Sequence, residues 1–248
     1  MRGGLPRMNY YVDIHSDLLP ELPAVGCRSL TAQEAADKLD RFRISNIKLA
    51  AAAPYYDPKV YSPDDFLALR DRQITALTGS AQPTRIVGAA VLPLQFCLDH
   101  PKLLKRFALG VSDYLLIDLP REPVTDAFCE TLSRLRIMSG LCPVAVDIDR
   151  YYDIWSPEDW ITLRRTGMLL QVSVRGLMQQ EHRKLSLYLL ANQYAHFVAT
   201  GAQNPEKPLH FTETMRLIQR SLPAQLYRRI KNNPGMLLSN AEPSSFLS

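Results

Sequence analysis

The chain has 248 residues, of which 46% are hydrophobic and 22% are charged, and its formal net charge is +4. These values are ordinary for a globular protein, and a chain of this length can bury a core without disulfide or metal staples. The modest charge does not indicate nucleic-acid binding. No apolar run is long enough for a membrane span or a signal peptide, so we expect a cytoplasmic protein without membrane insertion.

Seven short apolar segments are typical of strands. They are almost continuously apolar instead of alternating, which indicates strands buried on both faces, as in a parallel sheet. The expected strands are Tyr10–Ile14, Ile47–Ala52, Arg85–Leu92, Tyr114–Asp118, Pro143–Ile148, Met168–Val172 and Phe197–Thr200.

Helix starts lie between these segments. Thr31 and Glu34 form a capping-box pattern, and Ser62-Pro63 and Ser156-Pro157 place serine at the N-cap and proline in the first turn. Further helices are expected at Val124–Met138, Glu181–Gln193 and Phe211–Ser221. Strands that alternate with helices predict an α/β barrel or a doubly wound sheet. We expect one domain over residues 1–248, with a disordered tail over residues 242–248.

The four cysteines exclude two kinds of chemistry. Cys27, Cys97, Cys129 and Cys142 are widely spaced, and no pair forms the C-x-x-C pattern of a zinc knuckle or a redox site. None is followed by the x5-Arg loop of a cysteine-based tyrosine phosphatase. A phosphatase activity would therefore need another nucleophile.

Ligands of parallel α/β folds bind at the carboxyl ends of the strands, so the residues there are the candidates for chemistry. Taken in chain order, these segments are Asp13-Ile14-His15-Ser16-Asp17, Ala53-Pro54-Tyr55-Tyr56, Gly88-Ala89-Ala90-Val91, Asp147-Ile148-Asp149-Arg150-Tyr151, Leu170-Gln171-Val172-Ser173 and Ala199-Thr200-Gly201-Ala202-Gln203-Asn204.

In this order the segments resemble the PHP superfamily, named for polymerase and histidinol phosphatase, and within it the bacterial tyrosine phosphatases of capsule and exopolysaccharide synthesis. The corresponding family motifs are D-x-H-x-H, T-P-H-Y, G-x-E-I, H-x-E-R-Y, L-Q-x-N and A-S-D-x-H-N. The resemblance implies a distorted seven-stranded (β/α)7 barrel. It also implies a metal-dependent hydrolase with two or three divalent ions, usually manganese, and a phosphotyrosine protein or a polysaccharide-assembly kinase as partner.

Most of the metal ligands that the resemblance implies are replaced. His15 is retained, and Asp17 stands where the family has its second histidine. The other positions are changed, to Tyr55, Ala90, Asp147, Gly201 and Gln203. Alanine and glycine side chains offer no donor atom, and neutral tyrosine and glutamine are poor ligands for hard cations. We therefore expect no tightly bound metal, and at most one weakly held ion on His15, Asp17 and Asp147.

The remaining polar residues have two interpretations each. His15 can be a hydrogen-bonded core histidine instead of a ligand. Asp147 and Asp149 lie two apart at a strand end, so we expect their side chains to point the same way. They can form an acid/base pair or be solvated loop carboxylates. Arg150 can bind phosphate as a catalytic remnant, or pair structurally with Asp147 or Asp153.

The sequence leaves three hypotheses for the function. The leading hypothesis is a pseudophosphatase with a binding or regulatory role in polysaccharide assembly. The second is a working phosphoesterase with a reduced metal site, and the third is a structural partner that docks a kinase or glycosyltransferase. If the resemblance holds, His15, Asp17, Tyr55, Ala90, Asp147, Gly201 and Gln203 should meet in one pocket, with Arg150 near its rim and more room than in an active relative.

Overall fold

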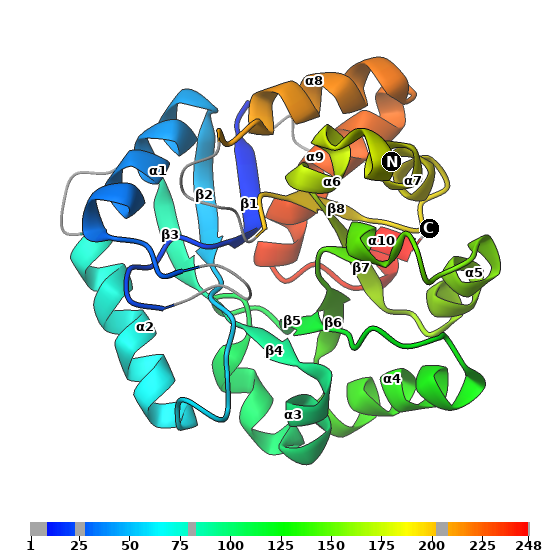
Figure 1. Ribbon diagram of the computed structural model, residues 1–248, viewed down its shortest axis with the longest axis horizontal. Coiled ribbons are helices and arrows are strands. Elements are labelled where there is room, and N and C mark those ends of the chain that lie inside the picture. Colours follow the sequence, from blue (N-terminus) through cyan, green and yellow to red (C-terminus); the bar gives the residue numbers. More distant parts are fainter. Residues whose placement is uncertain (1–8, 23–27, 79–82, 202–207, 248) are drawn as a thin grey trace, which may run out of the picture.

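Parallel strands lie at the centre of the molecule, with helices around them (Figure 1). The computed structural model describes residues 9–22, 28–78, 83–201 and 208–247. The strands found there are β1 (Tyr11–Ser16), β2 (Ile47–Ala52), β3 (Arg85–Gly88), β4 (Val91–Pro93), β5 (Tyr114–Asp118), β6 (Cys142–Ala145), β7 (Leu169–Ser173) and β8 (Phe197–Ala199). They form a three-stranded sheet in the order β1-β2-β3 and a five-stranded sheet in the order β4-β5-β6-β7-β8.

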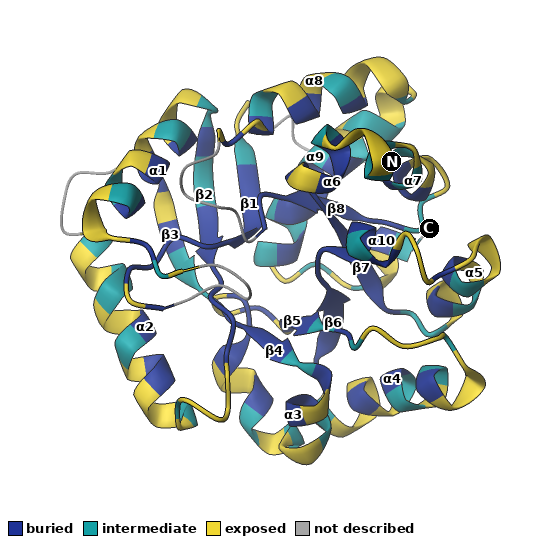
Figure 2. Cartoon of the chain, viewed as in Figure 1, coloured by how far each residue is buried: buried dark blue, intermediate teal, exposed yellow. Residues whose placement is uncertain are grey.

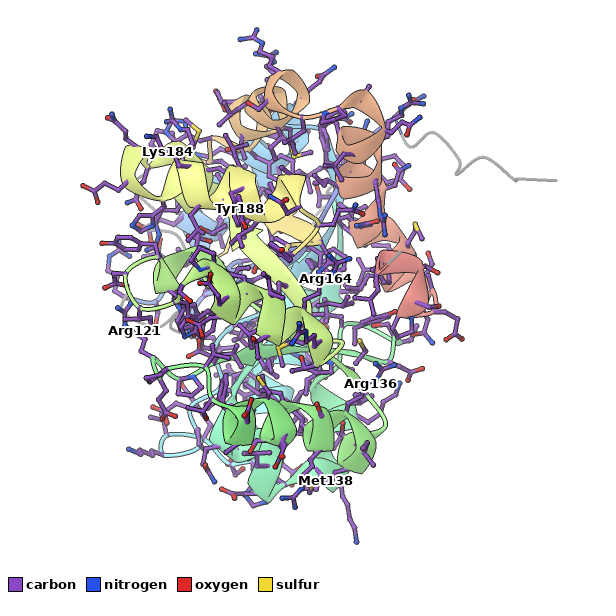
Figure 3. The ribbon with its side chains drawn as sticks, turned by 90° about the vertical axis from the view of Figure 1, so that its right-hand side faces the viewer. Arg121, Arg136, Met138, Arg164, Lys184 and Tyr188 are labelled. Carbon is purple, nitrogen blue, oxygen red and sulfur yellow. The ribbon has the colours of Figure 1, made fainter. Side chains whose placement is uncertain are left out.

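Helices cover the outer faces of the strands. They are α1 (Ala32–Ile44), α2 (Pro63–Thr78), α3 (Leu94–Asp99), α4 (Asp126–Ser139), α5 (Pro157–Arg165), α6 (Val174–Met178), α7 (Gln180–Ala191), α8 (Phe211–Ser221), α9 (Ala224–Leu238) and α10 (Ser244–Leu247), with 3-10 helices η1 (Pro101–Phe107) and η2 (Ile148–Tyr151). Among these helices none is both long and apolar enough to span a membrane. Met138 of α4, Arg164 of α5 and Tyr188 of α7 lie on the same side of the molecule, the one that faces the viewer in Figure 3.

The expected strand Arg85–Leu92 is two strands, so the predicted seven-stranded arrangement is not confirmed. β3 ends at Gly88, and β4 begins at Val91 in the other sheet. The Ala89 amide donates to the Ala52 carbonyl at 2.9 Å, and the Val91 amide donates to the Pro54 carbonyl at 3.0 Å, so both amides face the segment that runs out of β2. The break between β3 and β4 falls at the two buried alanines Ala89 and Ala90, whose apolar side chains hide it in a hydropathy pattern.

The strands are buried on both faces, as their continuous apolar sequences predict. In β5, Leu115 and Ile117 belong to a cluster with side chains of α4, whereas Tyr114 and Leu116 belong to a second cluster with side chains of other strands. Figure 2 shows the strands buried and the outer helix faces exposed. Burying one large aliphatic side chain stabilises the fold by about 1.5–3 kcal/mol, so these two clusters account for much of the driving force for folding.

The predicted helix starts are confirmed. The Thr31 hydroxyl accepts a hydrogen bond from the Glu34 amide at 3.2 Å, and the Glu34 carboxylate accepts one from the Thr31 amide at 2.8 Å. Ser156 forms the same capping box at the start of α5. Ser62 accepts from the Asp65 amide at 3.2 Å. Each of these caps satisfies helix N–H groups that have no partner within the helix. Because the capping residue and these N–H groups lie within one turn, the start of such a helix can be predicted from the sequence.

The prediction of a disordered tail over residues 242–248 is wrong for the part that the structure describes. Residues Ser244–Leu247 form α10, and the Phe246 side chain is buried. Its ring packs against Tyr114 and Phe197 with centroid distances of 5.9 and 5.4 Å. The Tyr114 hydroxyl also donates to the Ala241 carbonyl. One aromatic side chain therefore anchors a segment whose polar composition suggests fraying.

Candidate functional site

Three side chains from three strand ends meet in a hydrogen-bonded group. His15 Nδ1 lies 3.1 Å from Gln171 Oε1 and 3.6 Å from Asp147 Oδ1. Gln171 Oε1 also accepts from the Asp147 amide at 3.1 Å, while Gln171 Nε2 donates to Asp147 Oδ1 at 3.2 Å. The parallel strands β1 and β7, together with the segment after β6, bring these residues to one end of the sheet.

The side-chain amide of Gln171 determines which ring nitrogen of His15 carries the hydrogen. Gln171 Nε2 donates to the Val172 carbonyl at 2.7 Å, so the amide oxygen must face His15 and the Asp147 amide. An amide oxygen only accepts hydrogen bonds, so His15 Nδ1 carries the hydrogen. In the neutral ring, Nε2 is then the atom with the lone pair. Gln171 follows from the sequence only as part of a motif, and its central position was not predicted.

Asp147 and Gly201 fit together tightly. Asp147 has a left-handed backbone with φ of 49°, and Gly201 has φ of 68°. A Cβ atom on Gly201 would lie 2.7 Å from Asp147 Oδ1. The Gly201 amide donates to the His15 carbonyl at 2.9 Å, which holds this close approach in place. A side chain at position 201 is therefore excluded while Asp147 keeps its position.

Tyr55 lies beside His15, and neither Tyr55 nor Ala90 offers a good metal ligand. The Tyr55 ring centroid lies 6.1 Å from that of His15. Burial, followed by the negative charge of Asp147, raises the pKa of Tyr55 well above its usual value. The phenol therefore stays protonated and neutral. Ala90 is fully buried and precedes Val91, which forms a parallel bridge with Tyr55.

Asp17 is buried beside this group. Its pKa is raised by burial, and the opposing charges of Lys38 and His15 only partly offset this. The Lys38 ammonium donates to the Asp17 backbone carbonyl. Asp17 Oδ1 has no hydrogen-bond partner within the part of the chain that the structure describes.

Asp13 and Thr200 join the first and last strands. The Thr200 hydroxyl donates to Asp13 Oδ2 at 2.6 Å, and the Thr200 amide donates to Asp13 Oδ1 at 3.2 Å. Asp13 is fully buried, and burial raises its pKa to about 6 despite these donors. The role of Thr200 was not predicted. A buried aspartate inside an apolar strand was the available indication, because such a group needs donors from another element.

The two carboxylates Asp147 and Asp149 do not face the same way, contrary to the prediction. Asp147 is left-handed and η2 starts at the next residue, so the alternation of a strand does not apply. Asp149 is fully buried and accepts from the Ser173 amide at 2.6 Å and the Ser173 hydroxyl at 2.9 Å. Burial, followed by the charge of Asp147, raises the pKa of Asp149 to about 6. Neither carboxylate is a solvated loop residue.

Arg150 pairs with neither Asp147 nor Asp153, so both predicted ion pairs are wrong. Its Nη2 contacts the Asp118 carboxylate and donates to the Leu119 carbonyl at 3.1 Å. Asp153 is instead held by both oxygens to Arg121, at 2.9 and 2.8 Å. The Arg150 guanidinium is therefore held at the end of β5, a position that no sequence motif indicated.

The residues at this site do not fit the multinuclear metal centre that the resemblance implies. Across residues 9–22, 28–78, 83–201 and 208–247, no three His, Cys, Asp or Glu side chains are grouped so as to hold a metal ion. His15 and Asp147 approach each other, but Ala90 and Gly201 carry no donor and Tyr55 is neutral. Position 203 lies outside the described residues. The expectation of one weakly held ion, and that of a roomier pocket, remain predictions.

Comparison with known proteins assigns the family. The family model for capsular polysaccharide synthesis, CpsB/CapC, matches residues 11–239. The tyrosine-protein phosphatase YwqE of Bacillus subtilis (strain 168) is 24% identical over 241 residues, which are 92% of each chain.

Solved structures share the fold. A chain from the crystal structures of YwqE from Bacillus subtilis and CpsB from Streptococcus pneumoniae, unique metal-dependent tyrosine phosphatases, superposes with a TM-score of 0.79 at 21% identity, covering 93% of this chain and 95% of that one. The histidinol phosphate phosphatase of Lactococcus lactis, solved with zinc, L-histidinol and phosphate, gives a TM-score of 0.54 at 10% identity, with 85% and 93% covered. The match of the family model over nearly the whole chain, together with this fold, shows that the protein belongs to the CpsB/CapC family of capsular polysaccharide synthesis.

Proposed function

We propose that this protein is a pseudophosphatase of the CpsB/CapC family, which keeps the fold of its metal-dependent relatives but acts in the cytoplasm by binding or regulation. Its partner would be a phosphotyrosine protein or a kinase of polysaccharide assembly. The observation that carries the proposal is the donor set. His15 and Asp147 stand together, but Ala90 and Gly201 have no donor atom and Tyr55 is a protonated phenol.

Physical chemistry supports this reading. Two neighbouring divalent cations need carboxylates between them to offset their repulsion, and the position where the family has its bridging glutamate is Ala90. A metal lowers the pKa of bound water to about 7, and without it hydroxide is scarce at neutral pH. The distorted barrel of the family remains part of the proposal. Two isolated parallel bridges support it, Ser16 with Gly201 and Tyr55 with Val91.

The test combines metal content with turnover. After dialysis, elemental analysis should give well under one equivalent of manganese, iron or zinc per chain, and hydrolysis of phosphotyrosine peptides should not rise when manganese is added. The variants His15→Ala and Asp147→Ala should leave the residual rate unchanged. A manganese-dependent rate that both variants abolish, or two equivalents of tightly bound metal, would establish the working phosphoesterase instead.

A further inference from the structure

A cavity of about 450 Å³ opens at the carboxyl ends of β4 and β5, between α3 and α4. In Figure 1 these two helices lie next to each other at the lower edge of the molecule. The cavity is separate from the group around His15, and none of the six family metal positions that the structure describes lines it. It touches the site described above through Asp118 and Leu119, the two partners of Arg150 named there.

The walls of the cavity are apolar. Leu94 and Leu98 of α3 form one side, Leu119 follows β5, and Phe128 of α4 forms the other side. A ligand that buries methylene or methyl groups against these walls gains about 25 cal/mol for each Å² of apolar surface removed from water. The volume suits one long side chain together with part of a neighbouring one, not a folded domain.

Every polar side chain of the lining offers an acceptor. Asp118 and Glu122 supply carboxylates, and Glu122 makes no ion pair with any residue that the structure describes. The amide nitrogen of Gln95 donates to Asp99 at 2.9 Å, which leaves its oxygen as an acceptor. The Thr131 hydroxyl donates to the Ala127 carbonyl at 2.8 Å, so its lone pairs remain. No lysine, arginine or histidine is among the described lining residues.

We propose that this cavity binds an arginine or lysine side chain, flanked by an apolar residue, from a peptide segment of a partner protein. Acceptors on apolar walls match such a side chain, because its stem is aliphatic and its head carries only donors. Arginine fits better than lysine, since its planar guanidinium presents five donors and can bond the Glu122 carboxylate and a second acceptor of the lining at once. The same lining disfavours a phosphorylated side chain, because Glu122 repels it and Asp118 already occupies Arg150. The inference rests on the proposed binding role and names the chemistry of the partner.

The test uses the full chain and a defined probe, the peptide acetyl-leucyl-arginyl-leucinamide, followed by NMR chemical shifts. The peptide should perturb amides of residues 94–98 and 118–131. A citrulline peptide, which keeps the shape and loses the charge, should bind about tenfold more weakly. Glu122→Gln should weaken binding about fivefold, the effect expected for one partly exposed charge pair, and Glu122→Lys should abolish it.

The matched control is Glu130→Gln, which removes a charge from the exposed face of α4 but does not line the cavity. This variant should bind like the wild type. Equal affinity for the arginine and citrulline peptides, unchanged binding by Glu122→Gln, or shifts that map elsewhere would overturn the proposal. Tighter binding of a phosphotyrosine peptide to the same amides would do so as well. A chain that binds the peptide and also hydrolyses phosphotyrosine with manganese would refute the pseudophosphatase and leave the cavity assignment intact.

Discussion

At the scale of single residues, the side chains and backbone of the site fit one another closely. Gly201 provides the space that the Asp147 carboxylate occupies, and Gln171 then bonds both the Asp147 amide and carboxylate. A carboxylate at position 147 and a side chain at position 201 are therefore mutually exclusive in the present geometry. The network also satisfies buried polar groups that would each cost about 1–3 kcal/mol if left without a partner.

Replacing Gly201 with alanine tests this fit. Gly201→Ala adds strain at positive φ, and its Cβ must also displace the Asp147 carboxylate. Gly140→Ala is the matched control, because Gly140 has φ of 69° but nothing lies within 4 Å of the added Cβ. We expect the control to lose about 1 kcal/mol of unfolding free energy, and Gly201→Ala to lose about 1–3 kcal/mol more. Urea unfolding measures both, and equal losses would show that no steric conflict exists.

At the scale of elements, the pairing of β7 with the start of β8 depends on a buried histidine. The Leu170 amide donates to His196 Nδ1 at 3.1 Å, and the His196 amide donates to the Leu170 carbonyl at 2.8 Å. Burial, followed by the positive charges of Arg229 and Arg164, lowers the pKa of His196 to about 3. The ring must stay neutral to accept the Leu170 hydrogen, so protonation would break this pairing.

The His196 side chain has a lower pKa in the folded chain than in the unfolded chain, and this difference sets how the stability changes with pH. The unfolded histidine has a pKa of about 6.5, so between about pH 6.5 and 3 only the unfolded chain binds this proton, and the contribution to stability is lost as the pH falls. His196→Asn keeps an acceptor for Leu170 and removes the titration. The difference in unfolding free energy between wild type and variant should therefore change by up to about 1.4 kcal/mol per pH unit in this range.

Buried carboxylates change the unfolding free energy with pH in the opposite direction to His196, so wild type and His196→Asn have to be compared at each pH. Asp13, whose folded pKa is raised to about 6, binds its proton more readily in the folded chain, so its contribution falls as the pH rises. This contribution cancels between wild type and His196→Asn. The exposed His100→Asn serves as control and should follow the wild type. Parallel pH profiles for wild type and His196→Asn would contradict the assignment.

At the scale of the whole molecule, α10 packs against the amino ends of the strands, opposite the site. Tyr114 begins β5 and Phe197 begins β8, and the Phe246 ring packs on both. A reciprocal pair of bonds adds to this, since the Asp113 amide donates to Asn240 Oδ1 at 2.8 Å and Asn240 Nδ2 donates to Asp113 Oδ2 at 2.9 Å. The last helix is thus part of the core and not an appendage.

Phe246→Ala should therefore lower the unfolding free energy by about 3–5 kcal/mol, because it removes a buried ring and leaves a cavity. Ile137→Ala is the control, since the Ile137 side chain is 82% exposed, and it should change the unfolding free energy by less than about 0.5 kcal/mol. Chemical denaturation measures both. A loss for Phe246→Ala as small as that of the control would mean that the tail is not docked in solution.

The sequence by itself determined the features that depend on neighbouring residues. The starts of α1, α2 and α5 follow from serine and threonine caps that bond amides within one turn. Continuous apolar runs indicated parallel strands buried on both faces, and the order of short motifs indicated the family. Each of these patterns is local or colinear, so no knowledge of long-range contacts was needed.

Only the tertiary structure decided which partners the polar residues take. Arg150 bonds Asp118, 32 residues away, instead of the nearer Asp147 or Asp153. Gln171 reaches His15 across 156 positions, and Thr200 reaches Asp13 across 187. The break at Ala89-Ala90 and the docking of Phe246 likewise depend on packing between distant segments. A buried polar or aromatic group must find a partner, but which one it finds is set by the three-dimensional register of the strands, which no local pattern encodes.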